Sequence, residues 1–261
     1  RGETLVEATG REHETCISDT LSTLTVYVDP VNDAPEIDLE KGGDATVLGV
    51  LEDSEPSAAN AKTASDLFER YFKDTKDGTL ADSFYGVMAV NPVDDPLVGH
   101  WVVSYDDGAT WETIVDGMFI GKDDLVSFEP ARVGDPGVTA DFNGRGPDLN
   151  VRLIETNIIE VEGQTEDHSA DVYDAGTKLV KADAEIGGKG CISADTVSAK
   201  VAVEAINDAP TFKTADHDVV LAEGSEDEPT PGVTIESIIS EKFQDIRDDV
   251  AKDPVYGTKD D

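Results

Sequence analysis

Two short segments of this chain carry oxygen-bearing side chains in a matched order. Val31-Asn32-Asp33-Ala34-Pro35 recurs as Ile206-Asn207-Asp208-Ala209-Pro210, so an asparagine and an aspartate stand side by side in each segment. Proteins bind calcium with about six to eight oxygen atoms, which carboxylates, asparagine side chains and backbone carbonyls supply. A turn just past the end of a strand offers all three kinds of oxygen. Each segment is therefore a candidate calcium site.

Acidic residues flank both segments in the same order. An acid precedes each segment, Asp29 or Glu204, and an acidic pair follows it, Glu52-Asp53 or Glu226-Asp227. The recurrence of these acids favours calcium binding over the alternative, a common Asn-Asp-x-Pro turn. The predicted metal ligands are Asp29, Asn32, Asp33, Glu52 and Asp53 for the first site, and Glu204, Asn207, Asp208, Glu226 and Asp227 for the second.

The two segments belong to a longer internal repeat. Cys16-Ile17-Ser18 precedes the first segment and Cys191-Ile192-Ser193 precedes the second, at the same spacing of 175 residues that separates the segments themselves. This period is the length of a domain and exceeds the roughly 20 to 50 residues of a solenoid repeat. We predict the C-terminal strands of a preceding repeat and its linker over residues 1–35, a complete repeat and its linker over residues 36–210, and the N-terminal part of the following repeat over residues 211–261.

Short apolar runs bounded by Gly, Pro and Asp predict strands along the chain. Apolar residues alternate before each linker, over residues 21–28 and 197–203, as they do in half-buried strands. Further strands are predicted over residues 84–90, 100–105, 111–115, 125–128 and 150–154. Several short strands at this spacing are typical of a β-sandwich. The predicted fold class is all-β, with tandem β-sandwich domains.

One short helix interrupts the predicted strands in each unit. Leu67, Phe68 and Tyr71 fall on one helical face, and Thr63 or Ser65 is available as the N-cap residue. The following copy keeps most of this pattern around Ile238 and Ile239. We therefore expect one helical turn per unit, packed against the strands.

The charge balance excludes several classes of partner. The chain has 57 Asp and Glu against 20 Lys and Arg, a formal net charge of −37. A nucleic-acid-binding protein needs a basic surface to displace counterions from phosphates, so nucleic acid is excluded as a partner. No stretch approaches the roughly 18 apolar residues of a membrane span, so no membrane insertion is expected in this segment. A solubilising acidic surface is the alternative explanation for most of these charges.

No arrangement of residues predicts catalysis. Ser104-Tyr105-Asp106-Asp107-Gly108-Ala109-Thr110-Trp111 fits the Asp-box pattern of sialidase propellers, but that box occurs once in the complete unit rather than once per blade. It predicts a hairpin in which the aspartate accepts backbone hydrogen bonds. The four histidines lack ligand spacing, and no nucleophile motif is present. We expect a protein that is not an enzyme and has no catalytic residues.

The linkers resemble those of cadherin-like tandem repeats in large bacterial surface proteins and RTX adhesins. The middle of the unit is similar to the same family over the segments 99–111, 125–130, 141–144 and 149–152, in the same order. The resemblance implies cadherin- or Ig-like β-sandwich units that are extracellular or at the cell surface and stiffened by calcium. It also implies a role in cell adhesion as an adhesin extender, a surface filament or a surface layer.

The resemblance implies partners as well as a fold. Neighbouring repeats, or copies of the chain itself, are the expected partners of such an array. A glycan- or peptide-binding adhesin module, with a surface glycan or protein as its ligand, is the first alternative. A sialidase-like hydrolase is a distant one. Residues 155–190 do not match the family pattern, and an inserted binding element is one interpretation of them.

Overall fold

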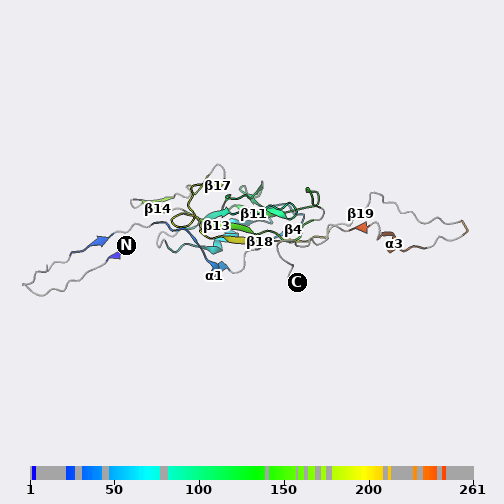
Figure 1. The fold of residues 1–261 in the computed structure, drawn as a ribbon, viewed down its shortest axis with the longest axis horizontal. Coiled ribbons are helices and arrows are strands. Elements are labelled where there is room, and N and C mark those ends of the chain that lie inside the picture. Colours follow the sequence, from blue (N-terminus) through cyan, green and yellow to red (C-terminus); the bar gives the residue numbers. More distant parts are fainter. Residues whose placement is uncertain are drawn as a thin grey trace, which may run out of the picture.

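The computed structural model describes much of the chain, and it is built mainly of strands (Figure 1). The described residues are 2–3, 22–26, 31–42, 47–76, 82–138, 141–156, 158–161, 164–167, 172–174, 178–207, 211–212, 226–227, 232–239 and 243–244. The helices described among them are short: α1 (Leu39–Gly42), α2 (Ala64–Phe68), the 3-10 turn η1 (Glu69–Tyr71) and α3 (Ile235–Ile239). The predicted all-β class is confirmed.

The larger sheet has six strands and contains the strand that leads to the second linker. Its order is β10-β7-β13-β18-β12, with β4 on β18, and only the pairing of β4 with β18 is parallel. The strands are β4 (Val47–Leu51), β7 (Phe84–Ala89), β10 (Phe119–Gly121), β12 (Gly144–Arg145), β13 (Leu149–Glu155) and β18 (Val197–Glu204).

The second sheet has four antiparallel strands in the order β5-β11-β8-β9. They are β5 (Lys62–Thr63), β8 (Gly99–Ser104), β9 (Glu112–Thr113) and β11 (Leu125–Pro130). Short antiparallel pairs complete the described strands: β1 (Gly2–Glu3) with β2 (Thr25–Val26), β3 (Glu36–Ile37) with β6 (Phe72–Lys73), β14 (Ile158–Val161) with β15 (Gln164–Asp167), β16 (Tyr173–Asp174) with β17 (Leu179–Val180), and β19 (Thr211–Phe212) with β20 (Phe243–Gln244).

One hydrophobic core joins the two sheets. Leu153 and Val201 of the larger sheet are buried in the same cluster as Trp101 and Phe128 of the smaller one. The rings of Trp101 and Phe128 meet edge to face at 5.7 Å, a favoured aromatic geometry. The indole Nε1 of Trp101 donates to the carbonyl of Pro147 at 2.8 Å, so its polar atom is satisfied inside the core.

Helix α2 begins directly after Thr63, one of the two N-cap candidates of the sequence. Thr63 Oγ1 accepts a hydrogen bond from the amide of Asp66, and the Asp66 carboxylate accepts one from the amide of Thr63. This capping box satisfies two amides that lack partners within the helix. Leu67 and Phe68 are then buried in the core. The complete unit also contains α1, a second short helix that the sequence did not predict.

Residues 172–174 and 178–192 include side chains that pack on the face of the larger sheet pointing away from the core. Phe119 and Ile154 lie on that face because successive side chains of a strand point to opposite sides. They form a second buried cluster with Val172, Cys191 and Ile192. The ring of Phe119 stacks on that of Tyr173 at 4.3 Å and 8°. This part of residues 155–190 is therefore a packed cover of the sheet.

Strand β18 runs from one end of the unit to the other. It runs over eight residues, and at about 3.3 Å per residue it spans about 23 Å. Glu155 at the end of β13 lies beyond the beginning of β18, whereas Leu51 at the end of β4 is paired with Glu204 at its far end. Figure 1 shows β14 beyond one end of the sheets and β19 beyond the other.

Candidate functional site

The predicted linkers meet the body of the unit at two separate places. The upstream joint consists of Asn32, Asp33 and Ala34 with Glu155 and residues 188–191. The downstream joint consists of Glu52, Asn143, Glu204 and Ile206. Each joint contains a glutamate that is 0% exposed, Glu155 in the first and Glu52 in the second. A buried carboxylate is costly unless hydrogen bonds stabilise its charge, so the partners of these two groups matter.

At the upstream joint, the side-chain amide of Asn32 enters a pocket of acceptors. Its Nδ2 donates to Glu155 Oε1 at 3.1 Å and lies 3.3 Å from the carbonyl oxygens of Lys189 and Gly190. The Cys191 sulfur is 4.0 Å from the same nitrogen. A primary amide carries two N–H donors, and every group facing it here accepts. We call Glu155, Lys189, Gly190 and Cys191 the acceptor socket.

The rest of this linker is anchored beside the socket. The amide of Ala34 donates to the carbonyl of Gly188 at 2.9 Å, and Pro35 is buried. The other polar atom of the Asn32 side chain, Oδ1, is buried and accepts no hydrogen bond from the described residues. Leaving such an oxygen unsatisfied costs about 1–3 kcal/mol. This oxygen would suit a hard cation as a ligand.

Glycines shape the turn that presents the carbonyls of the socket. Gly187 and Gly188 have φ of 72° and 62°, in the left-handed region that other residues rarely adopt. A Cβ atom on Gly190 would collide with the backbone carbonyl of Glu185. The Gly-Gly-Lys-Gly sequence at 187–190 therefore allows the backbone to approach Asn32 with its oxygens.

A cleft of about 340 Å³ lies beside the linker at the same end of the unit. Its charged lining consists of Asp33, Glu36, Asp195 and Lys76, and Pro35 and Gly188 also border it. Lys76 Nζ is 2.7 Å from Glu36 Oε1. The hydrogen bond from Lys76, together with its positive charge, lowers the pKa of Glu36.

At the downstream joint, the carboxylate of Glu52 binds the beginning of the second linker. Its Oε1 accepts the backbone amide of Ile206 at 2.7 Å, and its Oε2 accepts Nδ2 of Asn143 at 3.0 Å. Asn143 is 6% exposed. The backbone amide of Glu52 donates to the carbonyl of Glu204 at 2.9 Å. Hydrogen bonds to charged groups are worth about 1.5–3 kcal/mol each, so this carboxylate holds the linker firmly.

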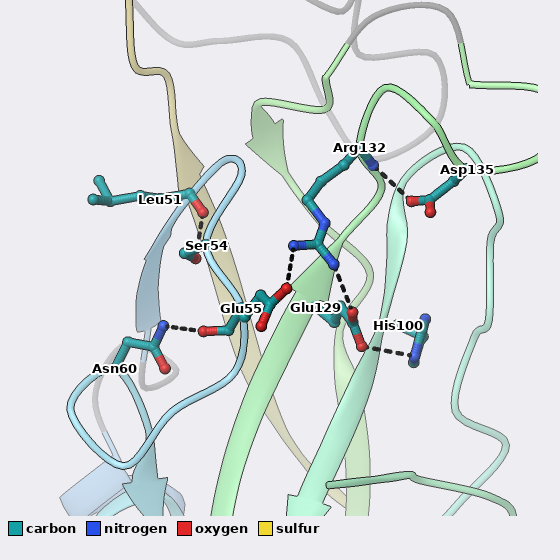
Figure 2. Close-up of polar contacts among 8 residues, drawn as sticks. All are labelled: Leu51, Ser54, Glu55, Asn60, His100, Glu129, Arg132 and Asp135. Carbon is teal, nitrogen blue, oxygen red and sulfur yellow. Dashed lines mark hydrogen bonds and ion pairs between the residues drawn. The ribbon is translucent and has the colours of Figure 1, made fainter.

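An ion-pair network positions the loop that follows Glu52. Figure 2 shows the Arg132 side chain between Glu55 and Glu129, with distances of 3.4 Å and 3.1 Å. Glu129 also lies 3.6 Å from the His100 ring. Asn60 donates to the carbonyl of Glu55 at 3.0 Å. The loop from β4 is thereby tied to β11 and β8, close to the buried Glu52.

The sequence predicted that Asn32 and Asp33 form one site with Glu52 and Asp53. The structure does not bring the two pairs together. The parallel pairing of β4 with β18 carries Glu52 to the end of the unit where the second linker begins. The length of the unit therefore separates it from Asn32. Asp53 follows in the turn with φ of 61°.

The remaining predicted ligands fall in three groups. Glu204 and Asn207 are exposed at the downstream joint, and Glu204 contacts Glu52 through its backbone carbonyl. Glu226 and Asp227 are exposed in a turn. Asp29 and Asp208 lie outside the described residues. In the described part of the chain, no three His, Cys, Asp or Glu side chains are placed to hold a metal ion.

Sequence reasoning missed Glu155 and Asn143, which complete the two joints. Glu155 ends a predicted strand and Asn143 follows Asp141-Phe142, so neither stands near a linker in the sequence.

The Asp-box segment forms the predicted hairpin between β8 and β9. Asp106 accepts the amide and hydroxyl of Thr110 at 2.8 and 2.7 Å and the hydroxyl of Ser104 at 2.8 Å. These hydrogen bonds, from Thr110 first, lower the pKa of Asp106 to about 2. Gly108 has φ of 90° in the turn. The carboxylate is engaged within its own turn, which is a structural role.

Comparison with known protein families, with curated proteins and with solved structures finds no match to this chain. No helix in the described ranges is long and apolar enough to cross a membrane.

Proposed function

We propose that this protein is a non-enzymatic structural or adhesion protein of the cell exterior, built as a tandem array of cadherin-like β-sandwich units. The observation that carries the proposal is that a buried carboxylate fastens a linker at each end of the same unit. Glu155 holds Asn32 of the first linker, and Glu52 holds Ile206 of the second. A flexible tether would be solvated, whereas linkers with buried anchors suit an array that keeps its shape under load.

The sandwich architecture is supported by the shared core. The six-stranded and four-stranded sheets contribute side chains to one buried cluster, as two face-packed sheets do. The last strand, β18, leads directly into the second linker. This strand connects the core to the downstream joint, so a rigid core fixes the position at which the second linker leaves the unit.

Calcium at the joints is the second part of the proposal. The net charge of −37 makes like-charge repulsion between neighbouring units a cost that a divalent cation would relieve. Asn32, through its buried Oδ1, and Asp33 would hold calcium at the first joint, with acids from the preceding unit. Glu204, Asn207 and Asp208 would do so at the second. Bound calcium would supply positive charge and a bridge between oxygens of two units.

A glycan- or peptide-binding module is the second candidate, and the cleft beside Asp33 favours it. Its carboxylates and Lys76 could bind hydroxyl or amide groups. Linker residues form one wall of this cleft, so in an array it would lie at the joint between two units. We therefore rank ligand binding below the structural role.

Isothermal titration of calcium into the full chain tests the calcium part. We expect binding, and we expect Asp208→Ala to weaken it by about tenfold or more. The matched control is Asp183→Ala, because Asp183 is exposed and belongs to neither joint. Absence of calcium binding, or equal affinities for both variants, would contradict the proposal.

A further inference from the structure

We infer that each Asn-Asp-Ala-Pro linker is a two-sided clamp, in which adjacent residues are held by two successive units through direct hydrogen bonds. The inference rests on the proposed function, because it takes the two linkers as equivalent joints of one array. It goes further by naming the surface that receives the linker asparagine, by giving its chemistry, and by adding hydrogen bonds at the joint that do not require calcium.

The second linker shows how the preceding unit holds a linker. The amide of its first residue, Ile206, donates at 2.7 Å to the buried carboxylate of Glu52. The same carboxylate is fixed from its other side by Asn143. Both carboxylate oxygens have a donor, so the position of Ile206 relative to the body of that unit is defined.

The first linker shows how the following unit holds a linker. Its second residue, Asn32, fills the acceptor socket, and its fourth residue, Ala34, donates to Gly188. The socket uses a wholly buried carboxylate and two carbonyls of a glycine-rich turn. These groups belong to the unit that begins just after this linker.

Each linker shows one of the two attachments. The two observations can be combined because the linkers match residue for residue. Ile206 corresponds to Val31 and Asn207 corresponds to Asn32. In one linker, the residue held by the preceding unit is therefore directly followed by the residue held by the next unit. Consecutive Cα atoms are about 3.8 Å apart. No unanchored residue lies between the two attachments, so bending at the joint would strain one of these hydrogen bonds.

The chemistry of the socket selects asparagine at this position. The groups around Nδ2 are acceptors, and one of them is a carboxylate. An aspartate of the same shape would place an oxygen against Glu155 and would face it with a second negative charge. The partner of the linker asparagine is thus a unit of this same kind that carries a buried glutamate and two inward carbonyls.

Hydrogen exchange of the full chain in EDTA tests the clamp without any contribution from calcium. In Asn32→Asp and Asn32→Ala, we expect the Ala34 amide to exchange about tenfold faster or more, while the Ile206 amide is unchanged. In Glu52→Gln, we expect the reverse. Asn91→Asp, an exposed site outside both joints, is the control and should change neither amide.

The possible outcomes separate the clamp from the calcium proposal. If Ala34 and Ile206 exchange at the wild-type rate in these variants, or if both respond to every variant, the clamp is overturned even when calcium binds. If the expected pattern appears in a chain that binds no calcium, the clamp stands and the calcium proposal fails.

Discussion

Glu52→Gln is the most informative single substitution in the body of the unit. The carboxylate of Glu52 is 0% exposed and accepts two hydrogen bonds, at 2.7 Å from Ile206 and 3.0 Å from Asn143. A glutamine side chain has nearly the same shape but only one oxygen, so its amide group must face one of the two donors. One hydrogen bond to a charged acceptor is lost, and a buried donor is left facing another donor.

The expected cost of this substitution follows from those contacts. Losing one charge-assisted bond and leaving a donor unsatisfied costs about 2 kcal/mol. For a folding unit of this size, about 2 kcal/mol lowers the melting temperature by about 4–8 °C. Urea denaturation should show a lower midpoint with an unchanged slope, because the core of the unit stays the same.

The matched control is Glu55→Gln on the same loop. Glu55 pairs with Arg132 at 3.4 Å, but its side chain is 81% exposed, and exposed ion pairs contribute about 1 kcal/mol or less. We expect the control to shift the melting temperature by much less than Glu52→Gln does. Equal shifts in the two variants would refute the assignment of Glu52 as a buried anchor of the linker.

Two further predictions concern the socket and the hairpin. Gly190→Ala should disturb the turn that faces Asn32, since its Cβ atom would meet the Glu185 carbonyl; the Asn32 side-chain amide signals should shift in nuclear magnetic resonance spectra, and unchanged signals would contradict the socket. The pKa of Asp106 lies at about 2, below its usual value, so its contribution to hairpin stability is present above the unfolded-state pKa of about 3.9 and is lost as the pH falls through about 2. Acid unfolding of Asp106→Asn should lack this component, and identical acid profiles for variant and wild type would count against it.

Much of the secondary structure was predictable from local patterns. The predicted strands at 84–90, 100–105, 125–128 and 150–154 correspond to β7, β8, β11 and β13, because apolar alternation bounded by turn residues is a local signal. The strand predicted at 111–115 is shorter, with β9 covering only Glu112–Thr113. The sequence left Thr63 and Ser65 open as the cap, and the structure selects Thr63 through its hydrogen bonds with Asp66.

The joints could be predicted only in part, because long-range pairing assembles them. The linker residues Asn32 and Asn207 were visible from the repeat. The position of Glu52 in the fold could not be predicted, because it depends on the parallel pairing of β4 with β18 across about 150 residues of sequence. Glu155 and Asn143 reach the joints through the same topology. The packing of Val172, Tyr173 and Ile192 on the sheet was also missed, because it depends on their long-range contact with the cluster around Phe119.

Small-angle X-ray scattering of the full chain, recorded in calcium and then in EDTA, tests the central claim that calcium stiffens joints between tandem units. Removal of calcium leaves acidic groups of neighbouring units repelling one another with no cation between them. We predict a change in the maximum dimension or in the flexibility of the chain on chelation, accompanied by a lower melting temperature. Identical scattering profiles and identical melting temperatures in the two conditions would contradict the claim.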